Sequence, residues 1–509
     1  MTEKIDKLSR EQKAMLSSAV SLLNQIATIV CGFILPRFFL KHYGSTVNGL
    51  ISSIAQFLSF ISFAELGVGA VVRSAFYKPL AEKNEEEISR ICLSSNKFFN
   101  RVAYILLAYV IILTIVYPFI TLDSFDFIYS ASLIVIISIS LFAQYFIGMT
   151  YKLLIAADQL SSIVLGLQCL STILNTVLSI ILIKLSVSVH LVRFVSSLVF
   201  TIQPIVLSVF AHHRYNIKKN VKLQGEPIKQ KWNGLAQHIA HVVLMNTDVV
   251  VLTLFSTLQN VSIYSVYHLV TYGLKNLVDS FTNGFMAMMG DQYARGEKAA
   301  LTNTLSRLEW MMHFITTLTY AVAWVAIIPF VEVYTQGITD AEYKQPLFAT
   351  IMIMAQAAYC YRLPYSILVV SAGHFKQTQN SAIIEAVLNI ALSVVFVIRF
   401  GIIGVAVGTL VAMMYRTGYF VWYLSKEIVQ RKIIYFVKHL IADAIAVAVI
   451  VCIRMLLPQM FALSSLTYLS WFILAIKAGV MCLIVVAVTN LVFYPNLVKG
   501  IVQKAKRRE

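Results

Sequence analysis

The chain is 509 residues long, and 59% of its residues are hydrophobic while only 13% are charged. Soluble proteins carry about a quarter charged residues, so this composition excludes a water-soluble protein and indicates an integral membrane protein. The net charge of +17 does not indicate nucleic acid as a partner, because the basic residues gather in the polar segments between apolar stretches. The six cysteines have no disulfide or metal-site spacing and are expected to be small core residues.

The first thirteen residues are polar, and no removable signal peptide is expected. A helix needs about 20 apolar residues to cross a bilayer. By this measure the sequence predicts an all-α protein with about fourteen transmembrane helices, near residues 14–38, 48–72, 99–120, 127–149, 160–184, 188–211, 234–256, 262–289, 308–334, 346–371, 378–398, 402–424, 438–457 and 468–494.

The distribution of Lys and Arg predicts the orientation of these spans. Inner segments, on the side of the N-terminus, hold 30 of these residues, and outer segments hold 7. Positive residues favour the cytoplasmic side, so both termini are expected in the cytoplasm. The two long loops, around residues 73–97 and 212–232, are expected to face the cytoplasm.

The second span contains an acidic residue within its apolar stretch, and this pattern occurs once more in the chain. It contains the carboxylate Glu65 and ends at Arg73, and an offset of 214 residues places Glu65 on Asp279. At the same offset NTVLS, from Asn175, meets NIALS, from Asn389. An internal repeat of six spans gives two halves of the same orientation, as in several transporters.

The repeat divides the chain into four parts. They are a six-helix lobe (1–211), a cytoplasmic linker (212–233), a second six-helix lobe (234–425), and two further transmembrane helices with a basic tail (426–509).

Several motifs then suggest a family. The runs YGSTVNG and FAELGVGAVVRSAFYKPLAEKNEEEIS, Asp248 in LMNTDVVVLTLF before VSIYSVY, and the layout of six, six and two spans resemble the polysaccharide transporter family. These are the Wzx-like flippases for O-antigen and capsule units, in the multidrug/oligosaccharidyl-lipid/polysaccharide (MOP) superfamily. Ser262 departs from the pattern, where a glycine often precedes the Ile-Tyr pair.

The resemblance implies two parallel lobes around a central cavity that opens alternately to each side of the membrane. The cargo would be an undecaprenyl-pyrophosphate-linked oligosaccharide, moved from the inner to the outer leaflet. Membrane lipid, a polysaccharide polymerase and chain-length machinery are the implied partners, and neither nucleic acid nor a cofactor is expected.

A pyrophosphate cargo requires a wet and partly cationic interior. Lys275 lies about 18 Å along its span, near the midplane, and Arg362 is also deep. Arginine suits phosphate, and tyrosines suit sugar faces. The residues predicted to bind substrate are Lys275, Arg362, Tyr361, Tyr365, Arg73 and Arg37.

Each of these residues also has a structural interpretation, which the sequence leaves open. Lys275 and Asp279 are four residues apart and can neutralise one another. Arg362 can clamp backbone carbonyls near Pro364, and Arg37 and Arg73 can be anchors at the ends of spans.

Carboxylates repel pyrophosphate, so the acidic residues indicate ion coupling or gating. Asp248, Glu385 and Asn389 are predicted to bind Na⁺ or a proton. Glu65 and Asp279 are predicted to form an inner gate with Arg73 or Arg362, or else one static ion pair per lobe. For Asp248 and Glu385 the alternative to ion coupling is helix packing through hydrogen-bonded carboxylates. His238 and His241 lack a third ligand, so no metal site is expected.

Two other functions remain open. A MATE-like exporter of small molecules would have the same two lobes, although deep basic residues suit an anionic cargo better than a cationic drug. A membrane-embedded polysaccharide polymerase or ligase would need a larger outer surface than these short outer loops provide, and no catalytic motif is evident.

Overall fold

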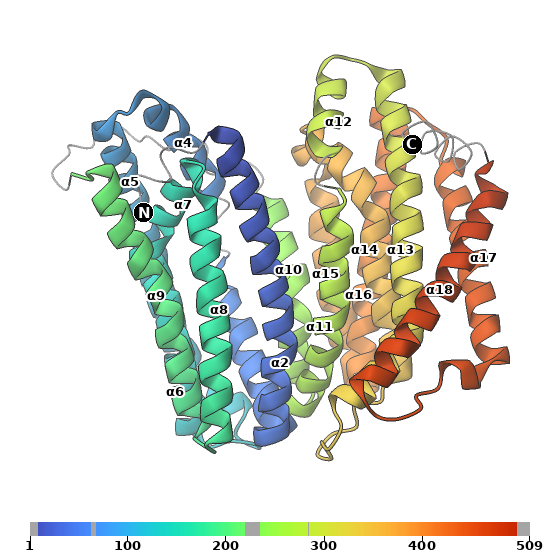
Figure 1. The fold of residues 1–509 in the computed structure, drawn as a ribbon, viewed down its shortest axis with the longest axis horizontal. Coiled ribbons are helices and arrows are strands. Elements are labelled where there is room, and N and C mark those ends of the chain that lie inside the picture. Colours follow the sequence, from blue (N-terminus) through green and yellow to red (C-terminus); the bar gives the residue numbers. More distant parts are fainter. Residues whose placement is uncertain (1–8, 63–67, 219–234, 283–284, 496–509) are drawn as a thin grey trace. The chain divides into compact units, whose positions relative to one another are not determined.

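The computed structural model describes residues 9–62, 68–218, 235–282 and 285–495, and all structural statements concern these residues. They form helices joined by short turns, with no strand in the described ranges (Figure 1). The prediction of an all-helical protein is confirmed. The chain divides into two compact units, Met1–Val242 and Val243–Glu509.

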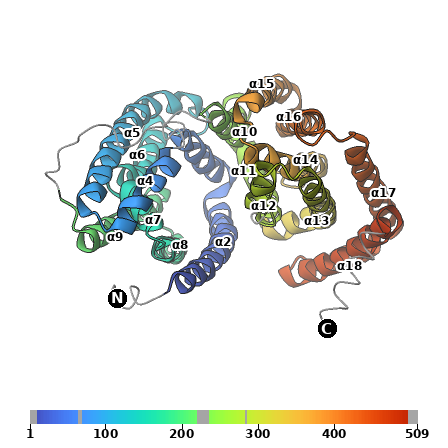
Figure 2. The same cartoon turned by 90° about the horizontal axis from the view of Figure 1, so that it is seen from above.

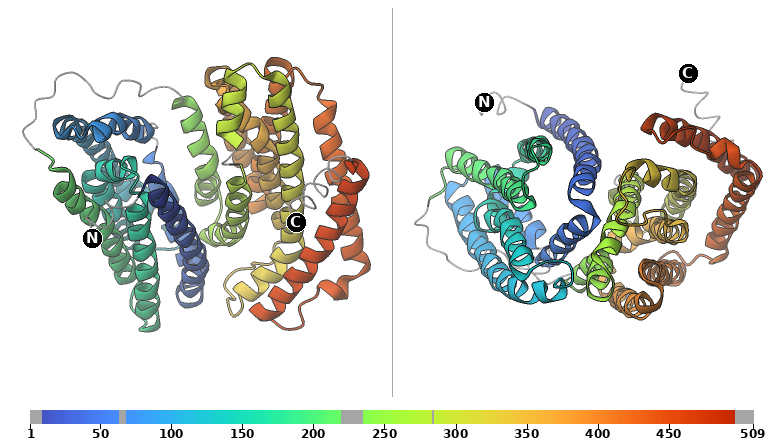
Figure 3. Two further views of the ribbon diagram at one scale, coloured as in Figure 1. Left: turned by 45° about the horizontal axis from the view of Figure 1, so that its top comes forward. Right: turned by 90° about the horizontal axis from the view of Figure 1, so that it is seen from below.

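The first unit is built from long helices that start at favourable capping residues. Ser9 and Gln12 cap each other reciprocally at the start of the first helix, and the Asn84 side chain accepts a hydrogen bond from the Glu87 amide at the start of α5. The elements are α2 (Arg10–Ser59), α4 (Val68–Glu82), α5 (Glu85–Ile120), α6 (Phe127–Ala143), η1 (Gln144–Gly148), α7 (Met149–Ala157), α8 (Ser161–Lys184) and α9 (Val189–Tyr215). Helices α2 and α8 run side by side (Figure 3).

The first two predicted spans are not separated by a loop. Helix α2 continues through residues 39–47, and the only non-helical backbone inside it is at Gly44 (φ 83°, ψ 174°). Glycine adopts positive φ without steric cost, so the chain turns sharply at this one residue while both arms remain helical.

The second unit contains most of α10 and all later helices. Its elements are α10 (Leu235–Phe255), α11 (Leu258–Ser280), α12 (Phe285–Ala294), α13 (Lys298–Tyr334), α14 (Pro346–Ser371), α15 (Phe375–Phe400), α16 (Ile402–Tyr423), η2 (Leu424–Ile428), α17 (Ile434–Leu456), η3 (Pro458–Phe461) and α18 (Tyr468–Phe493). The unit boundary at Val242 falls inside α10, later than the predicted end of the linker at residue 233.

Helix bounds repeat along the chain at the 214-residue offset found in the sequence. Shifting α5 by this offset gives 299–334, against Lys298–Tyr334 for α13. Shifting α8 gives 375–398, against Phe375–Phe400 for α15, and shifting α9 gives 403–429, against 402–428 for α16 with η2. The two halves therefore use the same succession of helices.

Two predicted spans are each divided between two helices. Helix α2 ends at Ser59 and α4 begins at Val68, while α11 ends at Ser280 and α12 begins at Phe285. Predicted spans 48–72 and 262–289 are thus each shared by two helices. By length and composition, ten of the described helices can cross a membrane, so the count of fourteen spans is not confirmed. Helices α11 and α14, which carry Lys275 and Arg362, are not among the ten.

The two C-terminal helices are fixed to α13 by buried polar contacts as well as by apolar packing. His313 Nδ1 lies 2.5 Å from an Asp443 carboxylate oxygen, and Thr317 donates to the other oxygen at 2.7 Å. Trp310 Nε1 donates to Asn490 Oδ1 at 2.9 Å. Helices α17 and α18 lie at one edge of the second unit (Figure 2).

Candidate functional site

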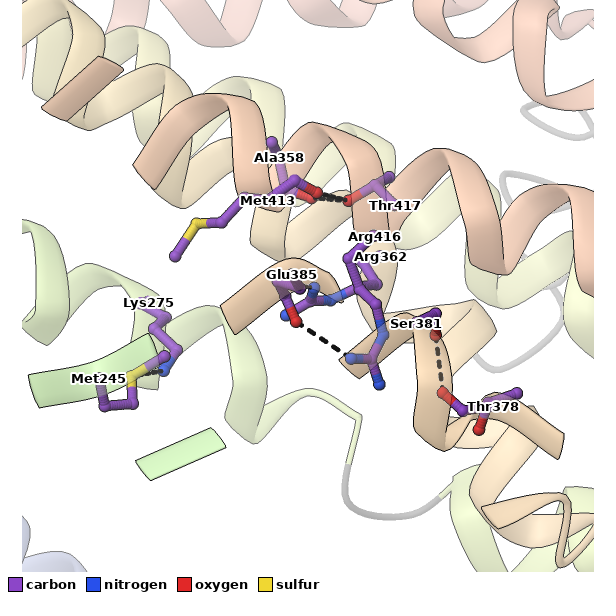
Figure 4. A network of polar contacts seen from close by, with 10 residues as sticks. All are labelled: Met245, Lys275, Ala358, Arg362, Thr378, Ser381, Glu385, Met413, Arg416 and Thr417. Atoms are coloured by element: carbon purple, nitrogen blue, oxygen red, sulfur yellow. Dashed lines mark hydrogen bonds and ion pairs between the residues drawn. The ribbon is translucent and has the colours of Figure 1, made fainter. Parts of the chain in front are cut away.

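A buried ion cluster joins three helices of the second unit. Glu385 of α15 accepts from Arg362 Nη1 of α14 at 2.5 Å and from Arg416 Nη1 of α16 at 3.1 Å (Figure 4). All three side chains are more than nine-tenths buried. One carboxylate thus serves two guanidinium groups, and the cluster keeps one excess positive charge.

Lys275 of α11 forms a second cationic group beside this cluster. Its amino group lies 4.3 Å from the ring centre of Tyr359 and 5.0 Å from that of Tyr272, and 3.7 Å from Met245 Sδ. The guanidinium of Arg362 lies over the same Tyr359 ring at 4.8 Å. Lys275 is buried, and no carboxylate among the described residues forms an ion pair with it.

This arrangement is energetically costly unless water or an anion reaches it. An aromatic face offers a cation about 2 kcal/mol when both are desolvated, which is less than the several kcal/mol needed to bury an unpaired charge. The four-residue spacing of Lys275 and Asp279 does not produce an ion pair, because the lysine turns toward the rings of Tyr272 and Tyr359.

A third group surrounds Asp248 of α10. The carboxylate accepts from Tyr264 Oη at 2.9 Å, from Thr409 Oγ1 at 2.8 Å and from Asn389 Nδ2 at 3.4 Å. Asp248 is 6% exposed, and all three donors are neutral. The amide oxygen of Asn389 has no hydrogen-bond partner among the described residues. Oxygen ligands from several helices around one carboxylate can bind a proton or a small hard cation such as Na⁺.

Stacked rings on α11 connect the second and third groups. Tyr264, which binds Asp248, stacks on His268 at 5.5 Å, and His268 stacks on Tyr272 at 5.1 Å. These residues are four apart and share one helix face. The ring of Tyr272 in turn lies under Lys275.

The structure places two of the predicted substrate-binding residues elsewhere. Tyr361 stacks on His313 at 4.6 Å and shares a hydrogen bond of 2.9 Å with Thr317. Tyr365 is 1% exposed and packs edge-on against Phe436 at 5.7 Å. Both tyrosines therefore face α13 and α17 rather than the Arg362 cluster, because their positions fall on another side of α14.

The remaining predicted residues are dispersed. Arg73 is exposed on α4 and Arg37 is half-buried on α2, both in the first unit. Asp279 is half-buried near the end of α11 and makes no ion pair with a described residue. Arg362 is paired with Glu385 rather than with a gate carboxylate. Glu65 and the side chains of His238 and His241 lie outside the described residues.

Several contributors to these groups were not among the predicted site residues, including Arg416, Tyr264 and Thr409. Arg416 had a signal in the sequence, since it is a basic residue within an apolar stretch. Tyr264 and Thr409 had none, because tyrosine and threonine are ordinary in membrane helices and their contacts cross from one helix to another.

Comparisons with known proteins agree on the fold. No protein-family model matches the sequence, and no curated protein does. Among solved structures, the lipid II flippase MurJ in its inward closed conformation matches with a TM-score of 0.69 and 16% identity, covering 95% of this chain and 100% of that one. An inward-facing multidrug resistance transporter of the MATE family, in the MOP superfamily, gives 0.53 and 14% identity, covering 81% of this chain and 98% of that one.

A further match is the MATE transporter VcmN of Vibrio cholerae in its bent form, with a TM-score of 0.54, 11% identity, and coverage of 83% and 99%. The first of these proteins is named as a flippase and the other two as transporters. The chain has the fold of MurJ and of these MATE transporters.

Proposed function

We propose that this protein is a flippase of the bacterial cytoplasmic membrane. It moves an oligosaccharide linked to undecaprenyl pyrophosphate from the inner to the outer leaflet, for the synthesis of a surface polysaccharide such as capsule or O-antigen. Its two six-helix lobes expose a central cavity alternately to each side, with both termini in the cytoplasm. The polymerase and the chain-length machinery act on the delivered unit.

The observation that carries this proposal is the position of Lys275. Its charge is buried in the second unit and forms no ion pair with any described residue, and it lies beside Arg362 over a shared aromatic ring. A pyrophosphate supplies the missing negative charge, and guanidinium and ammonium groups are its usual protein partners. The likeness to MurJ supports this choice, since it extends over 95% of the chain.

Ion coupling is the second part of the proposal. The Asp248 group holds a carboxylate with neutral donors only, so Na⁺ or a proton would compensate its charge. Its occupancy would bias the inward and outward states through a difference in affinity. The stacked rings of Tyr264, His268 and Tyr272 on α11 connect this group physically to Lys275.

A MATE-like exporter is the second candidate, favoured by the match of MATE structures to more than four-fifths of the chain. The two candidates differ in the charge of the cargo. The full-length chain in phosphatidylcholine nanodiscs should bind undecaprenyl pyrophosphate and lipid II, and should not bind the cationic dye ethidium. The opposite pattern would favour the exporter.

Transport itself is tested in cells. Depletion of the protein should trap the lipid-linked unit on the inner leaflet. If finished repeat units still appear on the outer leaflet at the normal rate without the protein, the flippase proposal is wrong. That result would favour a polymerase or ligase instead.

A further inference from the structure

The first unit contains a polar groove that the proposed function has not used. It encloses about 340 Å³ and is lined by residues of α6 to α7, α8 and α9. Helix α9 packs against both α6 and α8 and supplies residues between them. The polar members of the lining are Ser140, Gln144, Lys152, Gln168, Thr172 and Gln203. This groove lies entirely within one unit.

A widened turn and a close helix contact shape the groove. Residues Gln144–Gly148 form a turn of π-helix between α6 and α7, a feature often found at functional sites. A methyl group on Gly148 would lie 2.4 Å from Pro204 Cβ, so α7 and α9 approach as closely as they do only because this residue is glycine. Both residues line the groove.

Most of the polar side chains in the groove have no side-chain partner in the part of the chain that the structure describes. Lys152 forms no ion pair, and Gln144, Gln168 and Thr172 form no side-chain hydrogen bond, with any described residue. Gln203 uses one amide hydrogen on the Val164 carbonyl at 3.1 Å. No carboxylate is among the lining residues. The groove therefore offers one cation together with several free donors and acceptors.

The groove lies deep along its helices. Gln203 is about 21 Å from the first residue of α9 and about 18 Å from the last, at 1.5 Å per residue. Polar side chains at this depth are costly in lipid and usually line a path for a polar ligand. Lys152 near the end of α7 could reach the interface as an anchor, but this would not account for the amides.

The internal repeat identifies which residues of the second unit correspond to those in and around the groove of the first unit. At the 214-residue offset Gly148 corresponds to Arg362, and Pro204 corresponds to Gly418. Glu385 and Arg416 correspond to Ser171 and Ile202. In the second unit the residues at these positions include the ion cluster of Arg362, Glu385 and Arg416. The corresponding region of the first unit is a groove lined with amides and hydroxyls.

We propose that this groove binds the sugar part of the lipid-linked cargo. The sugar group that it recognises is anionic and rich in hydroxyls. Amides and hydroxyls both donate and accept hydrogen bonds, as sugar hydroxyls require, and Lys152 pairs with the negative charge. This inference rests on the proposed function and deepens it by assigning the groove of the first unit to the sugar.

The test compares two probes that differ in the sugar. The full-length chain in phosphatidylcholine nanodiscs is titrated with undecaprenyl pyrophosphate, which has no sugar, and with lipid II prepared without its peptide, which adds two sugars. Lys152→Gln and Gln168→Leu should each weaken lipid II binding about tenfold, the usual effect of losing one such contact, and leave the bare carrier within about twofold. Lys152→Arg should restore binding, and Lys184→Gln, an exposed change on α8, should alter neither affinity.

Other outcomes would overturn the inference. Equal weakening of both probes would assign the groove to the pyrophosphate, and no weakening of either would remove it as a binding site. If added phosphatidylglycerol competes with lipid II in the parent but not in Lys152→Gln, the occupant is an ordinary lipid headgroup. Failure of the parent chain to bind either probe would instead refute the proposed function, with which the inference falls.

Discussion

Lys275 and Arg362, on two different helices, face the same aromatic ring, with the amino group 4.3 Å and the guanidinium carbon 4.8 Å from the centre of Tyr359. Like charges this close repel unless counter-charge is present. Arg362 has Glu385, but Lys275 has no carboxylate partner among the described residues. The pair therefore marks where an anion is most strongly attracted in the second unit.

Removal of this charge should weaken anion binding. Lys275→Gln is expected to reduce the affinity for undecaprenyl pyrophosphate about tenfold, because a charge-assisted contact is lost, while Lys275→Arg should retain most of it. Titration of the protein in nanodiscs measures the effect. Lys477→Gln is the matched control, since Lys477 lies within α18 but is exposed. Equal affinity in Lys275→Gln and the parent would remove Lys275 from the binding site.

Removing the charge of Glu385 alone should destabilise the second unit more than removing the charges of Glu385 and Arg416 together. Glu385→Gln leaves Arg362 and Arg416 buried without a counter-charge, which costs roughly 3 kcal/mol or more. The double variant Glu385→Gln, Arg416→Gln should recover part of that loss. Thermal unfolding of the purified protein measures both. Arg399→Gln, an exposed change at the end of α15, serves as control, and a single variant as stable as the parent would contradict the prediction.

Asp248 should determine the response of transport to ion gradients. Asp248→Asn keeps the size of the side chain and one accepting oxygen but removes the charge that would bind a cation, so transport in proteoliposomes should lose its dependence on a Na⁺ or proton gradient. Thr409→Val should weaken that dependence by removing a ligand oxygen. The control is Thr247→Val, since the Thr247 hydroxyl donates to the Val243 carbonyl of its own helix at 2.6 Å. Gradient dependence that survives Asp248→Asn would place coupling elsewhere.

Gly148 should not tolerate a side chain. Gly148→Ala places a methyl group 2.4 Å from Pro204, so α7 and α9 must separate, at a cost of roughly 1 to 3 kcal/mol. The unfolding temperature is expected to fall. Gly166→Ala, on neighbouring α8, meets only Val20 at 3.9 Å and should be neutral or stabilising, because alanine favours helix. If both variants unfold at the parent temperature, the close approach at Gly148 does not exist in the protein.

The sequence alone determined the all-helical membrane character, because this depends on the number of consecutive apolar residues. The 214-residue repeat was also readable, since shared motifs keep their spacing along the chain, and the helix bounds follow it. The deep charges Lys275, Arg362, Asp248 and Glu385 stood out because ionisable residues are rare within apolar stretches.

Only the tertiary structure decided which of these charges meet. Asp248 contacts Asn389 and Thr409, which are 141 and 161 residues away, and Glu385 lies between arginines from two other helices. Helical periodicity indicates which residues share a face of one helix, but it does not indicate which face of another helix packs against it. For the same reason Tyr361 and Tyr365, close to Arg362 in sequence, pack against α13 and α17 instead.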